Sequence, residues 1–122
     1  MYTMYKDCAV YKTTNFIGKR WTLLILLELH KGKNKWKRYS ELKNKLLEIT
    51  PKILSLRLKE LEKEKLIKKK INTEKFPIKC QYCLTKSGKD FIKIIKDIKK
   101  WSLKWKFKNK KCEEKECEDC EI

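Results

Sequence analysis

The chain has 122 residues, a net charge of +17 from 33 basic and 16 acidic side chains, and a hydrophobic fraction of 41%. This length and composition fit one domain with a hydrophobic core, and they argue against a large multi-domain enzyme and against a disordered basic chain. The longest apolar-rich run, Trp21 to Leu29, is too short for the roughly 20 residues that a bilayer requires. Residues 1–10 contain no apolar segment typical of a signal peptide, so we expect a cytoplasmic protein that makes no contact with a membrane.

The charge is distributed unevenly. Residues 108–122 contain four lysines and six carboxylates, a net charge of −2, which leaves +19 on residues 1–107. We therefore expect residues 1–107 to form the folded domain and residues 108–122 to be a disordered acidic tail that contains cysteines. A strongly basic domain is typical of a protein that binds a polyanion, because neutralising phosphates releases condensed counterions.

Four helices are expected in the first half of the chain. A short helix at residues 13–17 precedes one at residues 21–29, whose side chains are apolar on nearly every face; we place this second helix at the centre, buried on all sides. A polar loop at residues 33–37 leads to an amphipathic helix at residues 39–47. Residues 50–64 form the fourth helix, because they begin with threonine, a favoured N-cap, and proline, a favoured first residue.

Two strands and a long helix follow. Residues 66–71 and 78–85 are expected to form a hairpin, since apolar and polar side chains alternate along its second strand. Residues 87–107 carry apolar side chains every three or four positions, which indicates an amphipathic helix of about five turns. The order predicts a mainly α (α+β) fold: a winged helix-turn-helix with a two-stranded wing and a long C-terminal dimerisation helix.

Five blocks of sequence occur in an order that one family shares. They are residues 8–10 (CAV), 16–21 (FIGKRW), 38–42 (RYSEL), 49–62 (ITPKILSLRLKELE) and 76–88 (FPIKCQYCLTKSG). These blocks resemble the C-P-V, I-G-G-K-W, R-F-x-E-L, recognition-helix and V-P-P-R-V-E-Y-S-L-T-x-x-G segments of HxlR-type transcriptional regulators, which are dimeric winged-helix proteins of the MarR-like group. The resemblance covers about residues 7–107, and it implies a homodimer that binds double-stranded DNA.

Two departures from the family pattern concern geometry. The loop at residues 33–37 is longer than usual, and its role is left open. Lys65 stands where a glycine commonly ends the recognition helix. If this lysine is left-handed, its conformation costs about 1–2 kcal/mol.

The helix at residues 50–64 presents a polar arc opposite a stripe of leucines that faces the core. We expect its N-terminal half to enter the major groove. There Ser55 would contact a base edge or a phosphate, Leu56 a thymine methyl group, and Lys52 guanine or a phosphate. The expected DNA contacts are Arg38, Thr50, Lys52, Ser55, Leu56, Lys59, Lys75 and Lys79, the last two on the wing, which would lie on the backbone or in the minor groove.

Some of these residues have a second interpretation. The lysines of this arc, which include Lys63, also fit an ordinary solvated helix face. Arg57 flanks the leucine stripe, so a structural ion pair and a phosphate contact are equally open for it.

The helix at residues 87–107 has more apolar surface than one small domain can cover. We expect it to form a homodimer interface together with residues 2–10, whereas packing onto its own domain is the alternative. A twofold dimer would place two recognition helices one helical turn apart, which predicts a pseudo-palindromic operator.

Cys8 and the two cysteines of the hairpin suggest different roles. Cys8 matches the N-terminal cysteine that some relatives in the resembled family use as a redox sensor; a small hydrophobic residue buried near the dimer interface is the alternative. Cys80 and Cys83 have C-x-x-C spacing, but a strand directs their side chains to opposite faces, so they cannot hold one metal ion. Cys80 is expected in the core.

The tail contains a C-x4-C-x2-C pattern at Cys112, Cys117 and Cys120. This spacing matches three of the four ligands of one type of iron–sulfur site, and zinc bound between chains or a disulfide are further alternatives. The neighbours are charged and no fourth ligand is near. We therefore favour free, reactive thiols, and we predict no metal and no cofactor.

Nothing in the sequence indicates an enzyme. The one histidine, His30, is placed to cap carbonyls next to Gly32, and no glycine-rich phosphate loop or nucleophile elbow is present. We predict a sequence-specific DNA-binding transcriptional regulator that acts as a homodimeric repressor, with control by thiol oxidation as an open addition. The alternative is a non-specific basic protein that binds RNA or chromatin, with its aromatic residues stacking on bases.

Overall fold

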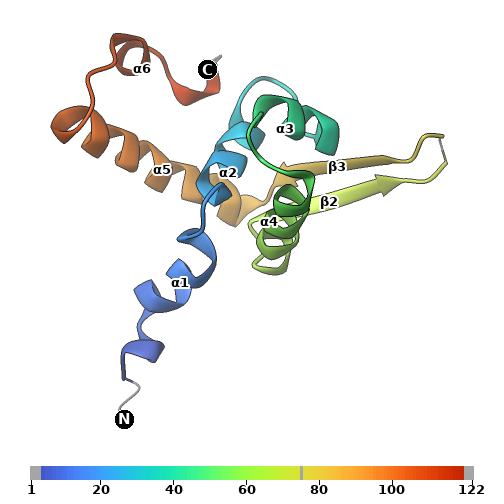
Figure 1. Ribbon diagram of the computed structural model, residues 1–122, viewed down its shortest axis with the longest axis horizontal. Coiled ribbons are helices and arrows are strands. Elements are labelled where there is room, and N and C mark those ends of the chain that lie inside the picture. The colour runs from blue at the N-terminus through green and yellow to red at the C-terminus, as the bar shows by residue number, and fades with distance from the viewer. Residues whose placement is uncertain (1–3, 75, 120–122) are drawn as a thin grey trace.

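The computed structural model describes residues 4–74 and 76–119, with side chains from Lys6 onward. Along the chain the elements are η1 (Met4–Asp7), α1 (Ala9–Ile17), α2 (Thr22–His30), β1 (Lys37–Arg38), α3 (Tyr39–Lys45), α4 (Pro51–Lys63), β2 (Ile67–Asn72), β3 (Lys79–Leu84), α5 (Lys86–Trp105), α6 (Lys110–Glu114) and η2 (Cys117–Asp119). Figure 1 shows a helical body around α2, from which α1, the β2–β3 hairpin and α5 project in three directions. The predicted winged helix-turn-helix is confirmed. No helix in the described ranges is long and apolar enough to cross a membrane.

Helix α2 lies at the centre of the body, as its apolar composition predicts. Ile25 and Leu26 are fully buried, and the helix packs against α3, α5 and β3. The expectation that every face is covered is wrong, because Leu24 is exposed. One side of the central helix is therefore open to solvent in the single chain.

The side chain of a lysine caps the C-terminal end of α2. Nζ of Lys37 donates to the main-chain carbonyls of Glu28 (2.7 Å) and Leu29 (3.1 Å), and also to that of Lys31. Burial lowers the pKa of Lys37. The capping that we expected from His30 is thus supplied by a residue seven positions later, and the imidazole turns toward the C-terminal tail instead.

Helix α4 begins where the sequence predicts. The hydroxyl oxygen of Thr50 accepts a hydrogen bond from the N–H of Ile53 (3.2 Å), and Pro51 is the first helical residue. Its inner stripe is buried in the core, as expected: Leu54, Leu58 and Leu61. These contacts hold the opposite side of α4 toward solvent.

The end of α4 is a Schellman motif with a lysine in the left-handed position. The N–H of Lys65 donates to the carbonyl of Glu62, and the N–H of Leu66 donates to that of Leu61, both at 3.0 Å. The φ angle of Lys65 is 65°. Lys65 is therefore left-handed, a conformation that costs a residue with a Cβ atom about 1–2 kcal/mol.

Within the described residues, three strands form one antiparallel sheet in the order β1-β3-β2. Strands β2 and β3 pair from Ile67 opposite Leu84 to Asn72 opposite Lys79, which confirms the hairpin. Strand β1 was not expected: Lys37 is the last residue of the predicted polar loop, Arg38 follows it, and the two residues pair with Tyr82 and Gln81 of β3. The base of the wing is therefore three strands wide.

The loop before β1 covers one face of this sheet. The ring of Trp36 lies 4.7 Å from Nζ of Lys70 and 5.7 Å from Nζ of Lys68. Cys83, the strand partner of Lys68, is fully buried, whereas Cys80 on the other face is only partly buried against the main core. The longer loop thus carries an aromatic cover for the side of the sheet that faces away from the core.

Helix α5 starts in close contact with the base of β2. The hydroxyl oxygen of Thr85 accepts from the N–H of Gly88 (3.3 Å). A Cβ atom on Gly88 would lie 2.1 Å from the carbonyl oxygen of Leu66, so no larger residue fits there. Further along, α5 buries Ile92 and Ile95, and most of its other apolar side chains stay outside the core.

The described part of the C-terminal tail is folded, where we expected disorder. Residues 110–119 form α6 and η2 and lie against α2 and α5 (Figure 1). The N–H of Gly32 donates to the carbonyl of Glu118 (3.0 Å), and Nζ of Lys99 donates to that of Lys115 (2.7 Å). Cys117 is buried in this contact.

Candidate nucleic-acid interface

The outer side of α4 combines polar, apolar and cationic groups. Lys52, Ser55, Leu56 and Lys59 are all exposed, as the helical pattern predicts. Leu56 has 45% of its surface exposed, whereas the leucines of the inner stripe have 1% or less. We call these four residues the α4 arc. It offers a hydroxyl group, an apolar side chain and two ammonium groups on about two turns of helix.

Hydroxyl groups organise the start of this helix. The hydroxyl of Tyr39 donates to the carbonyl of Pro51 (3.0 Å), and that of Ser55 donates to the Tyr39 oxygen (3.4 Å). Tyr39 therefore fastens α3 to the first turn of α4. Sequence reasoning had counted Tyr39 only as an apolar residue, because the periodic pattern says nothing about where its hydroxyl points.

Arg57 forms a structural ion pair. Its Nη1 lies 3.0 Å from Oε1 of Glu60, and its Nε donates to the main-chain carbonyl of Arg20 (3.1 Å). Lys19 pairs with the same Glu60 carboxylate. Burial is the largest single influence and raises the pKa of Glu60, but the hydrogen bonds and positive charges of Lys19 and Arg57 together outweigh it, so the pKa of Glu60 is lowered overall. These bonds tie α4 to the turn between α1 and α2.

The other predicted phosphate contacts, Arg38 before α3 and the two lysines of the wing, have different surroundings. Arg38 is exposed at the start of α3, where its main-chain N–H donates to the carboxylate of Glu41 (3.3 Å). Lys79 is half-buried and pairs with Asn72 across the hairpin. Lys75 lies outside the described residues.

Sequence reasoning missed a run of three exposed lysines on β2. They are Lys68, Lys69 and Lys70. Lys69 shares its face of the hairpin with the core residues at the base, and the two others flank Trp36 on the opposite face. The sequence feature that could have revealed them is the run of three lysines on a strand, because alternation along a strand places such a run on both faces of the hairpin. Of the three, Lys69 is on the face of the hairpin whose base packs against α4.

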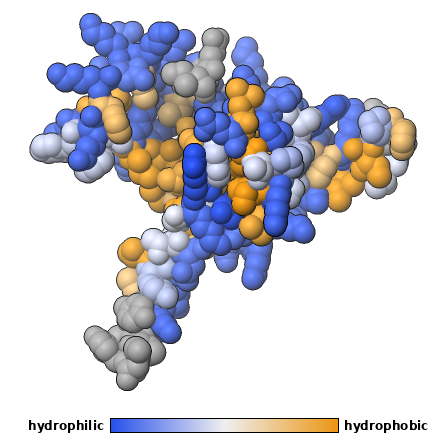
Figure 2. Space-filling model, viewed as in Figure 1, coloured by the Kyte–Doolittle hydropathy of each residue, from blue (hydrophilic) through white to orange (hydrophobic). Residues whose placement is uncertain are grey.

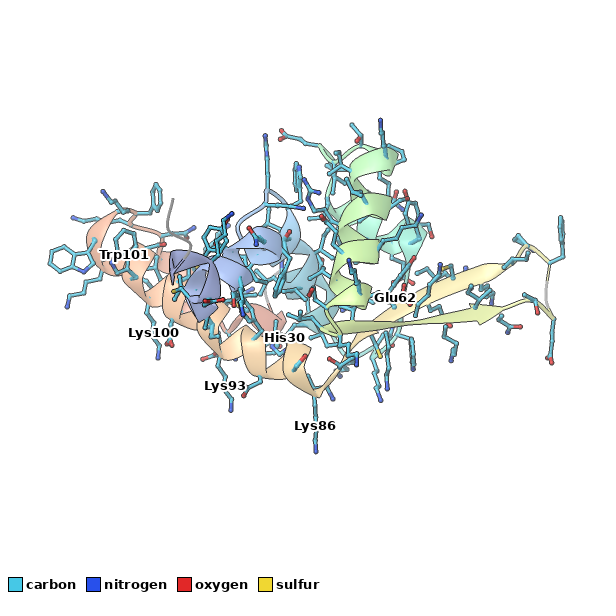
Figure 3. The ribbon with its side chains drawn as sticks, turned by 90° about the horizontal axis from the view of Figure 1, so that it is seen from below. His30, Glu62, Lys86, Lys93, Lys100 and Trp101 are labelled. Carbon is cyan, nitrogen blue, oxygen red and sulfur yellow. The ribbon has the colours of Figure 1, made fainter. Side chains whose placement is uncertain are left out.

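A second surface is apolar. Large side chains of α5 are exposed along its outer part, with exposed residues also on α1 and α2: Ile94, Ile98, Trp101, Trp105, Val10 and Leu24. Figure 3 shows Trp101 projecting from α5 away from the body, and 56% of its surface is exposed. A stripe of this kind is typical of a protein–protein contact.

The cysteines of the described residues are unpaired thiols. Cys8 is exposed at the N-cap of α1 in the single chain. Cys112 is half-buried and Cys117 is buried, while Cys120 lies outside the described residues. Across residues 4–74 and 76–119, no group of three or more histidines, cysteines and carboxylates is arranged to hold a metal ion.

Known proteins are similar to this chain in sequence and in fold. Residues 16–110 match the family described as HxlR-like helix-turn-helix. The chain is 36% identical over 94 residues to YvaP, an uncharacterized HTH-type transcriptional regulator of Bacillus subtilis (strain 168), and the match covers 77% of this chain and 83% of YvaP.

Two solved structures are similar as well. The reduced form of the transcriptional regulator YodB from B. subtilis matches with a TM-score of 0.70 and 27% identity, over 84% of this chain and 97% of YodB. The redox regulator HypR in its oxidized form matches with a TM-score of 0.70 and 27% identity, over 82% of this chain and 99% of HypR.

Proposed function

Because this chain belongs to the HxlR-like helix-turn-helix family of transcriptional regulators, we propose that it binds a pseudo-palindromic DNA operator as a homodimer and represses transcription there. The observation that carries this proposal is the α4 arc. A helix whose leucines are buried and whose outer side joins hydrogen-bonding, apolar and cationic groups suits the major groove, because base edges offer hydrogen bonds and methyl groups between two rows of phosphates.

Each residue of the interface has a proposed role. Ser55 and Leu56 read bases, and Lys52 reaches guanine or a phosphate. Thr50 at the helix start, Lys59 on the helix, Arg38 before α3, and Lys75 and Lys79 on the wing contact phosphates and fix the orientation of the protein. The lysines of β2 extend this row of phosphate contacts.

The exposed apolar side of α5 supports the homodimer. A twofold contact between two copies of α5, completed by the N-terminal segment, would remove side chains such as Ile98 and Trp101 from water. It would also set two α4 helices about 34 Å apart, one turn of B-DNA, which is why we propose a pseudo-palindromic site.

Thiol control is a further part of the proposal. The Cys8 thiol is exposed, as a group that reacts with an oxidant must be. HypR is named as a redox regulator, and YodB was solved in a reduced form. We propose that oxidation of Cys8 changes the affinity of this protein for DNA.

Fluorescence-anisotropy titrations test the proposal. The protein is titrated into its own upstream duplex and into a scrambled duplex, at two salt concentrations, with and without a thiol reductant. We expect a preference for the upstream duplex of about a hundredfold, or 2.7 kcal/mol, and a dependence on reductant that Cys8→Ser removes. Equal affinity for both duplexes, with an equal loss in salt, would instead indicate a non-specific basic protein.

A further inference from the structure

The tip of the wing is apolar, although the strands that carry it are basic. Phe76 has 97% of its surface exposed, Ile78 has 61% and Ile71 has 53%. Figure 2 shows hydrophobic side chains gathered at the far end of the hairpin, away from the body. We call Ile71, Phe76 and Ile78 the wing-tip patch.

Two of these side chains continue the inner face of the hairpin. Side chains alternate along a strand, so Ile71 lies on the same face as Ile67, which is buried at the base where β2 packs against α4. Ile78 lies directly before β3, two positions ahead of Cys80, whose side chain is on that face. The apolar face of the hairpin thus extends past the end of α4 into solvent, where the described part of the body leaves it uncovered.

Cationic groups flank the patch. Lys69 stands between the two isoleucines of β2 on the same face, and Lys68 and Lys70 stand on the other face. A matching surface must therefore be negatively charged at its edges and apolar between them. The minor groove of DNA has this character, because phosphates line its edges and an apolar side chain can enter between stacked base pairs at its floor.

The length of the hairpin agrees with this assignment. The β2–β3 ladder spans six residues on each strand, or about 20 Å at the usual rise of a strand. Half a turn of B-DNA measures about 17 Å. When α4 occupies the major groove, the hairpin is therefore long enough for the wing-tip patch to reach the neighbouring minor groove.

We propose that Phe76 acts as an apolar wedge: it enters the minor groove next to the recognition helix, partly unstacks one base step and bends the operator toward the major groove. Ile71 and Ile78 pack against the sugars beside it. The inference rests on the proposed function, because it requires α4 in the adjoining major groove. Base steps that unstack easily, such as TA and CA, are then preferred at a position that α4 does not touch.

Measurements of DNA bending and of base stacking test whether Phe76 acts as a wedge. An upstream duplex carries a donor and an acceptor dye at its two ends, and a second copy carries 2-aminopurine at successive positions of the flanking minor groove. Wild-type protein at saturation should raise energy transfer and brighten 2-aminopurine at one step. Phe76→Ala should lose most of both signals and about tenfold in affinity, while Phe76→Leu keeps part of them.

Thr73→Ala is the matched control, since Thr73 is exposed in the same turn and is polar. Phe76 is almost fully exposed, so Phe76→Ala should keep the wild-type thermal midpoint. The wedge is overturned if wild-type protein leaves the duplex straight at saturation or if Phe76→Ala bends it equally. It is also overturned if Phe76→Ala weakens self-association in sedimentation while bending is unchanged, because the patch would then contact a second copy of the chain.

The two proposals fail in different ways. A missing preference for upstream over scrambled DNA contradicts the regulator, whatever Phe76 does. Specific binding by wild-type protein together with an unchanged bend in Phe76→Ala contradicts only the wedge.

Discussion

One carboxylate oxygen of Glu118 lies 2.8 Å from Nε2 of His30, so the C-terminal tail is bonded to the end of α2 across 88 positions of sequence. The same oxygen accepts a hydrogen bond from Nζ of Lys96 on α5 at 2.6 Å. Hydrogen bonds from Lys96, from the main chain and from His30 lower the pKa of Glu118 to about 2. The Glu118 carboxylate in turn raises the pKa of Lys96. One side chain of the tail therefore holds two helices of the body.

Glu118→Gln should weaken this contact in a way that depends on pH. Because the pKa of Glu118 is lowered in the folded protein, its stabilising effect is complete above about pH 4.5, where the unfolded chain is ionised, and is lost as the pH falls toward 2. We expect the variant to lose about 1 kcal/mol or less at pH 7, since the pair is partly exposed. Thermal unfolding at pH 7 and at pH 2.5 measures this difference.

Glu114→Gln is the control for this experiment, because Glu114 lies on α6 of the same tail and is exposed. It should unfold like wild type at both pH values. A difference between Glu118→Gln and wild type that stays constant down to pH 2.5 would contradict the assigned role of the carboxylate.

Substitutions of Leu58 and Leu56 should affect different properties, the first stability and the second DNA binding. Leu58 is buried in the core and Leu56 is on the α4 arc. Leu58→Ala should cost about 2–5 kcal/mol in the free energy of unfolding. Leu56→Ala should change stability by about 0.5 kcal/mol or less but weaken binding to the upstream duplex about tenfold. Urea denaturation and anisotropy measure the two effects, and an unchanged affinity of Leu56→Ala would remove Leu56 from the interface.

Lys59→Ala should behave as the loss of one phosphate contact. We expect affinity to fall on upstream and scrambled duplexes alike, and the slope of log affinity against log salt to decrease by about 0.9. Lys93→Ala is the matched control: Figure 3 shows Lys93 projecting from α5 away from α4, and its side chain is 81% exposed. Equal salt slopes for the two variants would mean that Lys59 is only a solvated lysine.

Lys65→Gly should stabilise the protein. The left-handed conformation of Lys65 is strained for a residue with a Cβ atom, and glycine adopts it freely, although glycine also increases the entropy of the unfolded chain. The net gain should be up to about 1 kcal/mol. Lys63→Gly, at the last residue of α4, should instead lose up to about 1 kcal/mol. Chemical denaturation of both variants measures the change in the free energy of unfolding. A lower free energy of unfolding for Lys65→Gly than for wild type would contradict the proposed strain at Lys65.

Ile98→Glu should dissociate the proposed dimer. A charge placed in the exposed apolar stripe of α5 would be buried without a partner in a twofold contact, so self-association should weaken at least about tenfold. Analytical ultracentrifugation of wild type and variant measures the self-association. Lys100→Glu, a neighbouring substitution outside the apolar stripe, is the control. A wild-type protein that sediments as a monomer at micromolar concentration would contradict the homodimer.

Local patterns were enough to predict the elements that their own residues specify. Thr50 and Pro51 marked the start of α4, and the 3–4 spacing of apolar residues located α5. The α4 arc was found in the same way, because a buried leucine stripe determines which side chains point outward. Alternation along β3 also placed Cys80 and Cys83 on opposite faces, as the hairpin confirms.

Features that depend on distant partners could not be predicted. Strand β1 has two residues and no periodicity; only its pairing with β3 makes it a strand. The tail looked disordered because its residues are polar, and its docking depends on Glu118 meeting side chains of α2 and α5. Arg57 was left between two roles because its choice depends on Glu60 and the Arg20 carbonyl being within reach.

The docked tail lowers the positive charge over part of α5. Two of its carboxylates, Glu116 and Glu118, approach Lys96 of α5 at 3.8 Å and 2.6 Å, while α4 and the hairpin present exposed lysines such as Lys59 and Lys69. A chain that was equally positive all round would attract a phosphate backbone in any orientation. With one side partly neutralised, long-range attraction turns the protein as it approaches, so that α4 and the wing meet the DNA first and more encounters lead to binding.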